Sequence, residues 1–194
     1  MNRSVFCFAF VFLIACDSPG PGQGARAFSA APRMYTDFPV IEAGVRDWSD
    51  DVSAGQRSAD EREVLELLRK LVAMLEARDL SGLGELIARE RGLYVDYKAH
   101  RSYEELQKEI EQPDSYLNTY FLNTDALIAQ SGDGDKLAVR DVLRMTRTLK
   151  ADMYFVEDQC EIRLQLVDAP SRSHYLNHPV FVKEKGVWYI LRLL

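Results

Sequence analysis

Four residues that could do chemistry lie close together in the sequence: Tyr94, Asp96, Tyr97 and His100. On a β-strand, alternate side chains share a face, so Tyr94 and Asp96 would lie side by side with Tyr97 opposite. A buried aspartate with a raised pKa, beside a tyrosine or a histidine, can serve as a general base. The simpler explanation is a strand end whose polar residues face water. Asp96, His100 and Tyr94 are therefore candidates only, and the sequence assigns no catalytic residue.

Two other groups of side chains have part of a metal-binding pattern. His174 and His178 are four residues apart, but Pro179 follows them in a segment predicted to be a loop, and no carboxylate stands at a recognised spacing. Asp133 and Asp135 resemble half of a calcium loop, but the remaining ligands, including the closing glutamate, are absent. We therefore predict no metal and no cofactor.

The remaining chemistry-bearing residues also favour binding over catalysis. The chain has no nucleophile elbow, phosphate loop or dinucleotide-binding fingerprint. Cys160 is predicted to be a small buried apolar side chain rather than a reactive thiol. Tyrosine offers apolar area with a polar tip, so one set of tyrosines could either line a groove or protein interface or pack in the core: Tyr94, Tyr97, Tyr103, Tyr116 and Tyr120.

The N-terminus carries the most specific motif of the chain. Arg3 precedes ten apolar residues, 5–14, which are too few to span a hydrocarbon core of about 30 Å and are typical of a secretory signal. Leu13-Ile14-Ala15-Cys16 resembles the lipobox of bacterial lipoproteins. The resemblance implies cleavage after Ala15 and attachment of lipid, palmitate among the acyl chains, to Cys16. It places the protein in the cell envelope, anchored to a bacterial membrane, and leaves inner and outer membrane open.

Charge and cysteine content narrow the possible partners. Loss of residues 1–15 removes Arg3 and no acid, so the net charge changes from −6 to −7. An acidic chain without a basic face argues against nucleic-acid binding, because phosphate contacts need clustered lysines and arginines. With Cys7 in the signal and Cys16 acylated, Cys160 has no partner for an intramolecular disulfide. Stability must then come from a packed core.

The chain divides into three parts: a signal peptide at 1–15, a lipidated cysteine with a flexible tether at 16–57, and a single domain at 58–194. The glycine- and proline-rich stretch 18–24 is typical of a flexible linker. Residues 25–56 show no sustained periodicity. Phe38-Pro39-Val40-Ile41 could form an edge strand or dock on the domain, but we predict this segment to be mostly loop.

Helices dominate the first part of the domain. Ser58 and Glu61 have the spacing of a capping box, and leucines and valines then recur at three- and four-residue steps to about residue 77. A short helix at 83–89, a strand at 93–97 and a helix at 103–111 opened by Ser102 follow. Asp114 is expected to cap a short helix at 114–122; residues 123–130 are strand or loop, and 136–143 is helical.

The last third alternates in the manner of strands. Residues 160–166 place apolar and polar side chains on opposite faces, and 153–156, 180–182 and 187–193 are further strands. Short turns at 157–159 and 184–186 join neighbours into hairpins, which makes those pairs antiparallel. We therefore expect an α+β fold with N-terminal helices packed on a curved antiparallel sheet.

This order of elements resembles the NTF2-like superfamily. The resemblance rests on the bend Asp79-Leu80-Ser81-Gly82-Leu83 between the first helices and on the final strand Gly186-Val187-Trp188-Tyr189-Ile190, and it would cover residues 58–194. It implies a cone-shaped domain whose sheet wraps around helices and can hold a ligand. Some members are small isomerases or dehydratases that use an Asp–His or Tyr–Asp pair, and many only bind or assemble, so the fold alone does not decide the function.

Our leading hypothesis is a non-enzymatic envelope lipoprotein that binds a protein, a peptide or a small ligand near the membrane. The alternative is a small NTF2-like enzyme with acid–base chemistry around Asp96. A third possibility is an assembly subunit without a ligand, which would show a solid apolar interior and a broad exposed patch.

Overall fold

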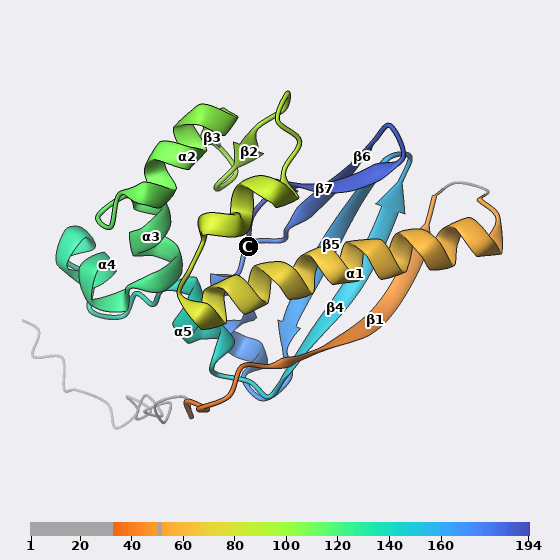
Figure 1. The fold of residues 1–194 in the computed structure, drawn as a ribbon. Coiled ribbons are helices and arrows are strands. Elements are labelled where there is room, and N and C mark those ends of the chain that lie inside the picture. Colours follow the sequence, from red (N-terminus) through yellow and green to blue (C-terminus); the bar gives the residue numbers. More distant parts are fainter. Residues whose placement is uncertain (1–32, 50–51) are drawn as a thin grey trace, which may run out of the picture. The chain divides into compact units, whose positions relative to one another are not determined.

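A seven-stranded sheet with a long helix lying across one face organises the described part of the chain (Figure 1). The computed structural model describes residues 33–49 and 52–194. The predicted signal peptide, the lipobox and residues 16–32 and 50–51 of the predicted tether lie outside these residues. The strands follow the order β1-β4-β5-β6-β7-β2-β3 across the sheet: β1 Val40–Trp48, β4 Thr148–Val156, β5 Gln159–Leu166, β6 Val180–Glu184, β7 Val187–Arg192, β2 Leu93–Tyr94 and β3 His100–Arg101.

The predicted α+β class is confirmed, but the sheet is mixed rather than antiparallel. Strands β4 to β7 form the antiparallel hairpins that the turns predicted, and Lys185 and Gly186 in the last turn both have positive φ. Strand β1 is parallel to β4, and β2 is parallel to β7. Both parallel pairs join segments about a hundred residues apart, which hairpin spacing cannot reveal.

Strand β1 corrects the predicted tether. Residues 40–48 are an edge strand of the sheet, so the folded region begins before residue 58. A bulge between Ala43 and Arg46 bends the strand, and the Val45 N–H donates to Asp152 Oδ1 at 2.7 Å. Gly44 is required there, because a Cβ atom would overlap that same carboxylate. The bulge and the one-sided burial of an edge strand remove the alternation that would have predicted it.

Helix α1, Ala54–Ala77, supplies the apolar face predicted from its periodicity. It starts earlier than expected, because Ser53 rather than Ser58 is the N-cap and accepts a hydrogen bond from the Gln56 N–H. At the other end, Arg78 adopts a left-handed conformation with φ 56°. Its N–H donates to Leu75 O and the next N–H donates to Met74 O, which closes the helix in a Schellman-type turn.

The segment between α1 and β4 is more helical than predicted. A 3₁₀ helix, η1 (Ser81–Leu86), precedes β2, and α2 (Tyr103–Glu111) has the capping box predicted from Ser102. Ser115 rather than Asp114 caps the next helix. The segment predicted to be strand or loop is also a helix, capped by an asparagine. The bounds are α3 Tyr116–Leu122, α4 Thr124–Ser131 and α5 Val139–Leu143, and a second 3₁₀ helix, η2, spans Pro170–Tyr175.

The space between α1 and the sheet is filled with apolar side chains. Leu68, Leu71 and Leu75 of α1 are fully buried and belong to one cluster with residues of the sheet such as Phe155 and Phe181. Cys160 is also fully buried, which agrees with the predicted apolar role. Burial raises the pKa of its thiol. Among the described residues there is no open cone between the helix and the sheet.

One buried carboxylate ties α1 to the β6–β7 hairpin. Asp60 Oδ1 accepts from Lys183 Nζ at 2.6 Å, from Trp188 Nε1 at 2.8 Å and from Gln56 Nε2 at 2.9 Å. The Asp60 side chain is 6% exposed. Three donors on one oxygen offset the cost of placing a charge there. The contact fixes the outer end of the hairpin against the first half of the helix.

Candidate functional site

The predicted catalytic candidates lie at the short strands β2 and β3 and in the loop that joins them. The strand expected over 93–97 ends at Tyr94, so Asp96 lies in the loop and does not share a strand face with that tyrosine. His100 begins β3, and its ring meets the Tyr94 ring edge-on with 4.8 Å between centroids. The His100 Nε2 is 2.6 Å from the carbonyl oxygen of Arg91.

Asp96 closes the loop by accepting hydrogen bonds from backbone N–H groups two and three residues later. Its Oδ1 accepts from the N–H of Lys98 at 2.6 Å and of Ala99 at 2.7 Å. Its Oδ2 is 3.5 Å from the hydroxyl of Tyr116. The two backbone hydrogen bonds lower the pKa of Asp96, and the contact with Tyr116 acts in the same direction. A general base at neutral pH needs a raised pKa, so this geometry does not favour the acid–base role.

Helix α3 brings two further tyrosines to the same surface. The rings of Tyr116 and Tyr120 stack with centroids 5.4 Å apart and planes 8° from parallel. Burial, the neighbouring Tyr120 and the Asp96 carboxylate raise the pKa of Tyr116 to about 12. Burial also raises the pKa of Tyr120. Both hydroxyls therefore stay protonated at neutral pH and can donate hydrogen bonds, but they cannot act as bases.

Tyr97 is a further exposed tyrosine of the β2–β3 loop. It is 60% exposed, and the Arg192 guanidinium lies 4.4 Å from the centroid of its ring. Arg192 is held in turn by two hydrogen bonds to the carbonyl oxygen of His178, at 2.8 and 3.0 Å. We call Tyr94, Tyr97, Tyr116 and Tyr120 the tyrosine surface.

The tyrosine surface has the composition of a protein interface. Tyrosine and arginine are enriched at the centres of such interfaces, and rings held by stacking lose little side-chain entropy when a partner binds. The polar groups of Asp96 and Arg192 already have hydrogen-bond partners, so a partner would not have to desolvate unpaired charges there. The arrangement suits docking better than proton transfer.

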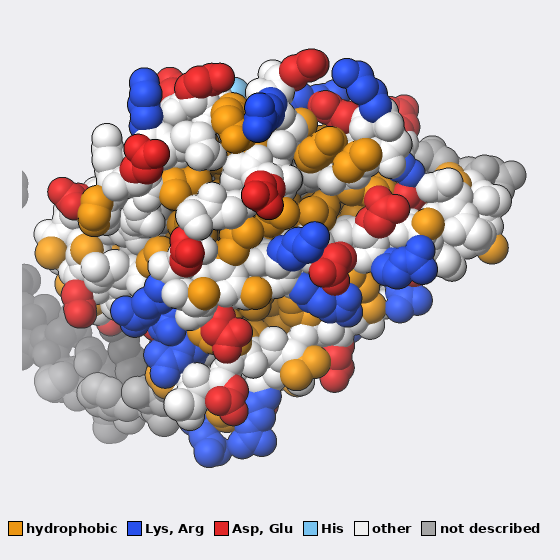
Figure 2. Space-filling model, in the orientation of Figure 1, with side chains coloured by type: hydrophobic (Ala, Val, Ile, Leu, Met, Phe, Trp, Pro, Cys, Tyr) orange, Lys and Arg blue, Asp and Glu red, His pale blue; other side chains and the backbone are white. Residues whose placement is uncertain are grey.

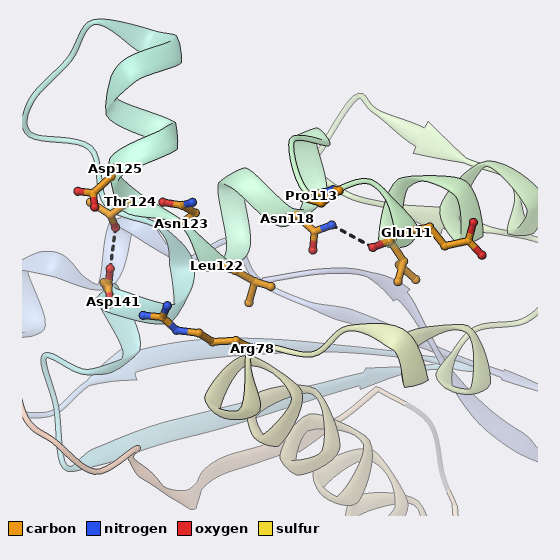
Figure 3. A pocket seen from close by; sticks show the side chains of 10 residues that line it. Arg78, Glu111, Pro113, Asn118, Leu122, Asn123, Thr124, Asp125 and Asp141 are labelled. Atoms are coloured by element: carbon orange, nitrogen blue, oxygen red, sulfur yellow. Dashed lines mark hydrogen bonds between the residues drawn. The ribbon is translucent and has the colours of Figure 1, made fainter.

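A second feature is a groove beside the end of α1, with a volume of about 640 Å³ (Figure 3). Arg78 extends across it from the helix end, Asn118 and Leu122 enter from α3, and Asp125 stands at the α4 side. The groove contains charges of both signs and apolar side chains. We call it the polar groove. Sequence reasoning missed it, because its residues come from four helices and the residue that ends α1.

The face of the molecule that carries α1 shows no group of side chains comparable to the tyrosine surface or the polar groove. Lysines, arginines and acids are interspersed over the helix, with apolar side chains exposed between and beside them (Figure 2). One apolar hollow of about 480 Å³ lies between α1 and β7, lined by Leu67, Val187 and Trp188. The charged side chains around this hollow all belong to α1: Arg62, Glu63, Glu66 and Lys70.

The predicted partial metal patterns stay incomplete within the described ranges. His174 Nδ1 lies 2.8 Å from the carbonyl oxygen of Ser171. Asp133 Oδ1 accepts a hydrogen bond from the N–H of Asp135 at 3.0 Å and so closes a turn. No group of three histidine, cysteine or acidic side chains in residues 33–49 and 52–194 is placed to hold a metal ion.

Comparisons with known proteins do not assign the chain to a family. No protein-family model matches the chain, and neither a curated protein nor a solved structure matches it significantly. Among the helices that the structure describes, none is both long enough and apolar enough to cross a membrane. The functional argument therefore depends on the sequence and on the geometry given above.

Proposed function

We propose that the protein is a lipid-anchored binding module of the bacterial cell envelope and that its tyrosine surface contacts a partner protein. The anchor part of the proposal is supported by the sequence Leu13-Ile14-Ala15-Cys16 directly behind an apolar stretch that follows Arg3. Several acyl chains on one cysteine give stable attachment to a membrane, whereas a single chain binds only marginally.

One observation carries the binding part of the proposal. Strand β2 and the β2–β3 loop carry exposed tyrosines, and the loop contacts two other elements: its Asp96 meets Tyr116 of α3, and its Tyr97 packs against Arg192 of β7. The exposed fractions are 39% for Tyr94, 60% for Tyr97 and 39% for Tyr116. Large side chains that are held in place and yet remain open to solvent are typical of a recognition surface.

The NTF2-like resemblance remains our proposal for the fold family. It is supported by the order α1, η1, β2, α2 and then the antiparallel strands β4 to β7. The filled space under α1 argues against a cone used as an active site. The enzyme alternative around Asp96 gains no support from a carboxylate held by backbone N–H groups with a lowered pKa.

The anchor is tested by replacing the cysteine. Wild-type protein should partition into the detergent phase and label with a palmitate analogue, and the Cys16→Ala variant should move to the aqueous phase without label. A Cys160→Ala variant is the matched control and should partition as wild type does. Partition of Cys16→Ala into the detergent phase would disprove lipid attachment at this residue.

The surface is tested by removing its most exposed ring. Tagged full-length protein extracted from its native envelope should retain a stoichiometric partner, and Tyr97→Ala should weaken that complex by at least about tenfold, the size of an interface hot spot. Val45→Ala changes an exposed side chain on β1, at the opposite edge of the sheet, and should have no effect. Equal loss in both variants, or in neither, would contradict the assignment.

A further inference from the structure

We propose that the polar groove binds a small zwitterion of the short-peptide class, with a carboxylate held by Arg78 and an ammonium group held at the acidic rim. The groove has a volume of about 640 Å³, within the range of about 300–1,000 Å³ that is typical of small-molecule sites. This site is separate from the tyrosine surface and does not depend on the proposed function. Four observations carry the inference.

The first is the conformation of Arg78. It ends α1 with φ 56°, in the left-handed region where glycine is the usual residue and where any side chain adds strain. A helix end that needs only closure would be more stable with glycine. An arginine at this position is explained if its guanidinium is useful where the turn places it, across the groove (Figure 3).

The second is that Arg78 has no side-chain hydrogen bond and no ion pair within the described ranges. The neighbouring Asp141 is already occupied, because Thr124 Oγ1 donates to it at 2.7 Å and Arg140 and Arg144 pair with it at 3.4 and 3.6 Å. Burial lowers the pKa of Arg140, and the positive charge of Arg78 lowers it further. An anion on Arg78 would relieve this repulsion, and an Arg–carboxylate pair is bidentate.

The third is the pair of acidic side chains at the rim. Glu111 on α2 and Asp125 on α4 line the groove on opposite sides of Arg78 (Figure 3), both are exposed, and neither forms an ion pair in the part of the chain that the structure describes. Two carboxylates would repel a simple anion, so phosphate or acetate alone is a poor fit. A ligand with an ammonium group as well as a carboxylate satisfies both signs of charge in the site.

The fourth is the middle of the groove. Asn118 Nδ2 donates to the carbonyl oxygens of Ile110 at 3.0 Å and Gln112 at 2.7 Å, which fixes the side chain and leaves its Oδ1 as an acceptor. Leu122 adds an apolar contact on the same helix face. A peptide N–H and an aliphatic side chain match this combination, which favours a short peptide over a free amino acid.

The probe is the tripeptide Ala-Leu-Ala, used with free termini, with an acetylated N-terminus and with an amidated C-terminus. Full-length protein in a mild detergent is titrated, and binding is measured by peptide-observed NMR. The free tripeptide should bind, and each blocked form should bind about tenfold more weakly, because each loses one charge-assisted contact. Equal binding of the free and acetylated forms, or no binding of the free tripeptide at 10 mM, on the order of the weakest useful affinity, would overturn the proposal.

The decisive variant is Arg78→Gly, because thermal stability is expected to rise while affinity for the tripeptide falls. It should raise the thermal midpoint by roughly 2–4 °C by removing left-handed strain and should reduce affinity for the tripeptide about tenfold. Lys185→Gly is the matched control: it relieves the same kind of strain, φ 51°, in the β6–β7 turn and should leave binding unchanged. Wild-type affinity in Arg78→Gly, or an equal loss in Lys185→Gly, would overturn the proposal.

Discussion

Two regions of this protein differ in whether their polar side chains are buried and paired or exposed to solvent. In the region formed by α1 and strands β4 to β7, the interior is apolar, and the buried Asp60 is held by three donors. In the region formed by the β2–β3 loop and helices α2 to α5, tyrosines stand exposed, and Arg78 faces a groove with no side-chain partner among the described residues.

The difference indicates that the first region stabilises the fold and that the second is available for binding. Side chains that are buried and paired stabilise the native state, since loss of one partner leaves another unsatisfied. Side chains that are exposed and held in place contribute little to stability and are available for recognition. Substitutions in the first region should therefore change stability, and substitutions in the second should change binding with the fold intact.

The largest expected effect compares one leucine from each region. Leu71→Ala empties a fully buried position between α1 and the sheet and should lower the free energy of unfolding by about 2–5 kcal/mol. Leu122→Ala removes the same atoms from the half-buried wall of the polar groove and should cost less than about 1 kcal/mol. Urea unfolding of both variants measures the difference. Similar losses would show that the two regions do not differ in this way.

A smaller effect tests the paired carboxylate. Asp60→Asn weakens the hydrogen bonds from Lys183 and Trp188 and should cost about 1.5–3 kcal/mol at neutral pH. Burial acts to raise the pKa of Asp60, but the hydrogen bonds from Lys183, Trp188 and Gln56 outweigh it, and the pKa lies below its usual 3.8. A group with a depressed native pKa stabilises the fold above its unfolded pKa, and this contribution is lost as the pH falls through the native value. The stability difference between wild type and variant should therefore shrink below about pH 4.

Constant destabilisation of Asp60→Asn from pH 7 to pH 2 would contradict the ionised pairing. Lys150→Met is the matched control, because Lys150 pairs with another buried carboxylate, Asp152, at 3.3 Å but is itself 40% exposed. Its effect should stay within about 1 kcal/mol, as is usual for a pair with an exposed partner.

The smallest effect distinguishes a structural from a catalytic role for Asp96. Asp96→Asn keeps an oxygen that can accept from Lys98 N–H and Ala99 N–H, so it should change stability by less than about 0.5 kcal/mol. Asp96→Ala removes both hydrogen bonds and should cost about 1 kcal/mol. Thermal unfolding measures both variants. A loss in Asp96→Asn as large as in Asp96→Ala would show that the charge, rather than loop closure, matters there.

The sequence predicted best the elements whose stabilising contacts are local or strictly periodic. The apolar face of α1, the capping box at Ser102 and the hairpins around residues 157–159 and 184–186 all show in short windows of sequence, and all are confirmed. The class α+β followed from them. These features depend on the order of neighbouring residues, which a single sequence displays directly.

Strand β1 and helix α4 were predicted wrongly, for different reasons. Strand β1 exists because it pairs with β4 about a hundred residues later, and its bulge over Gly44 breaks the alternation. Helix α4, predicted to be strand or loop, has an asparagine N-cap at Asn123 and no buried residue, so it has no apolar periodicity to detect. Tertiary context decided β1, whereas α4 begins at a local cap that the strand-or-loop prediction did not use.

The candidate surface was predicted in part. Tyr94, Asp96 and His100 could be selected from their spacing, and the structure brings the Tyr94 and His100 rings into contact while Asp96 lies in the loop between them. The contact of Asp96 with Tyr116, twenty residues later, and the packing of Arg192 on Tyr97 needed the fold. Arg78 gave no sequence signal, because a left-handed conformation at a helix end is expected at glycine, not arginine.

The most direct test of the central claim is site-specific photo-crosslinking in cells that make the protein. A photoreactive amino acid is placed at Tyr97 in one variant and at Val45, on the opposite edge of the sheet, in another. A discrete crosslinked partner from position 97, absent from position 45 and lost when Tyr116→Ala is added, is the predicted result. The same products from both positions, or none from position 97 in membrane-anchored protein, would contradict recognition through the tyrosine surface.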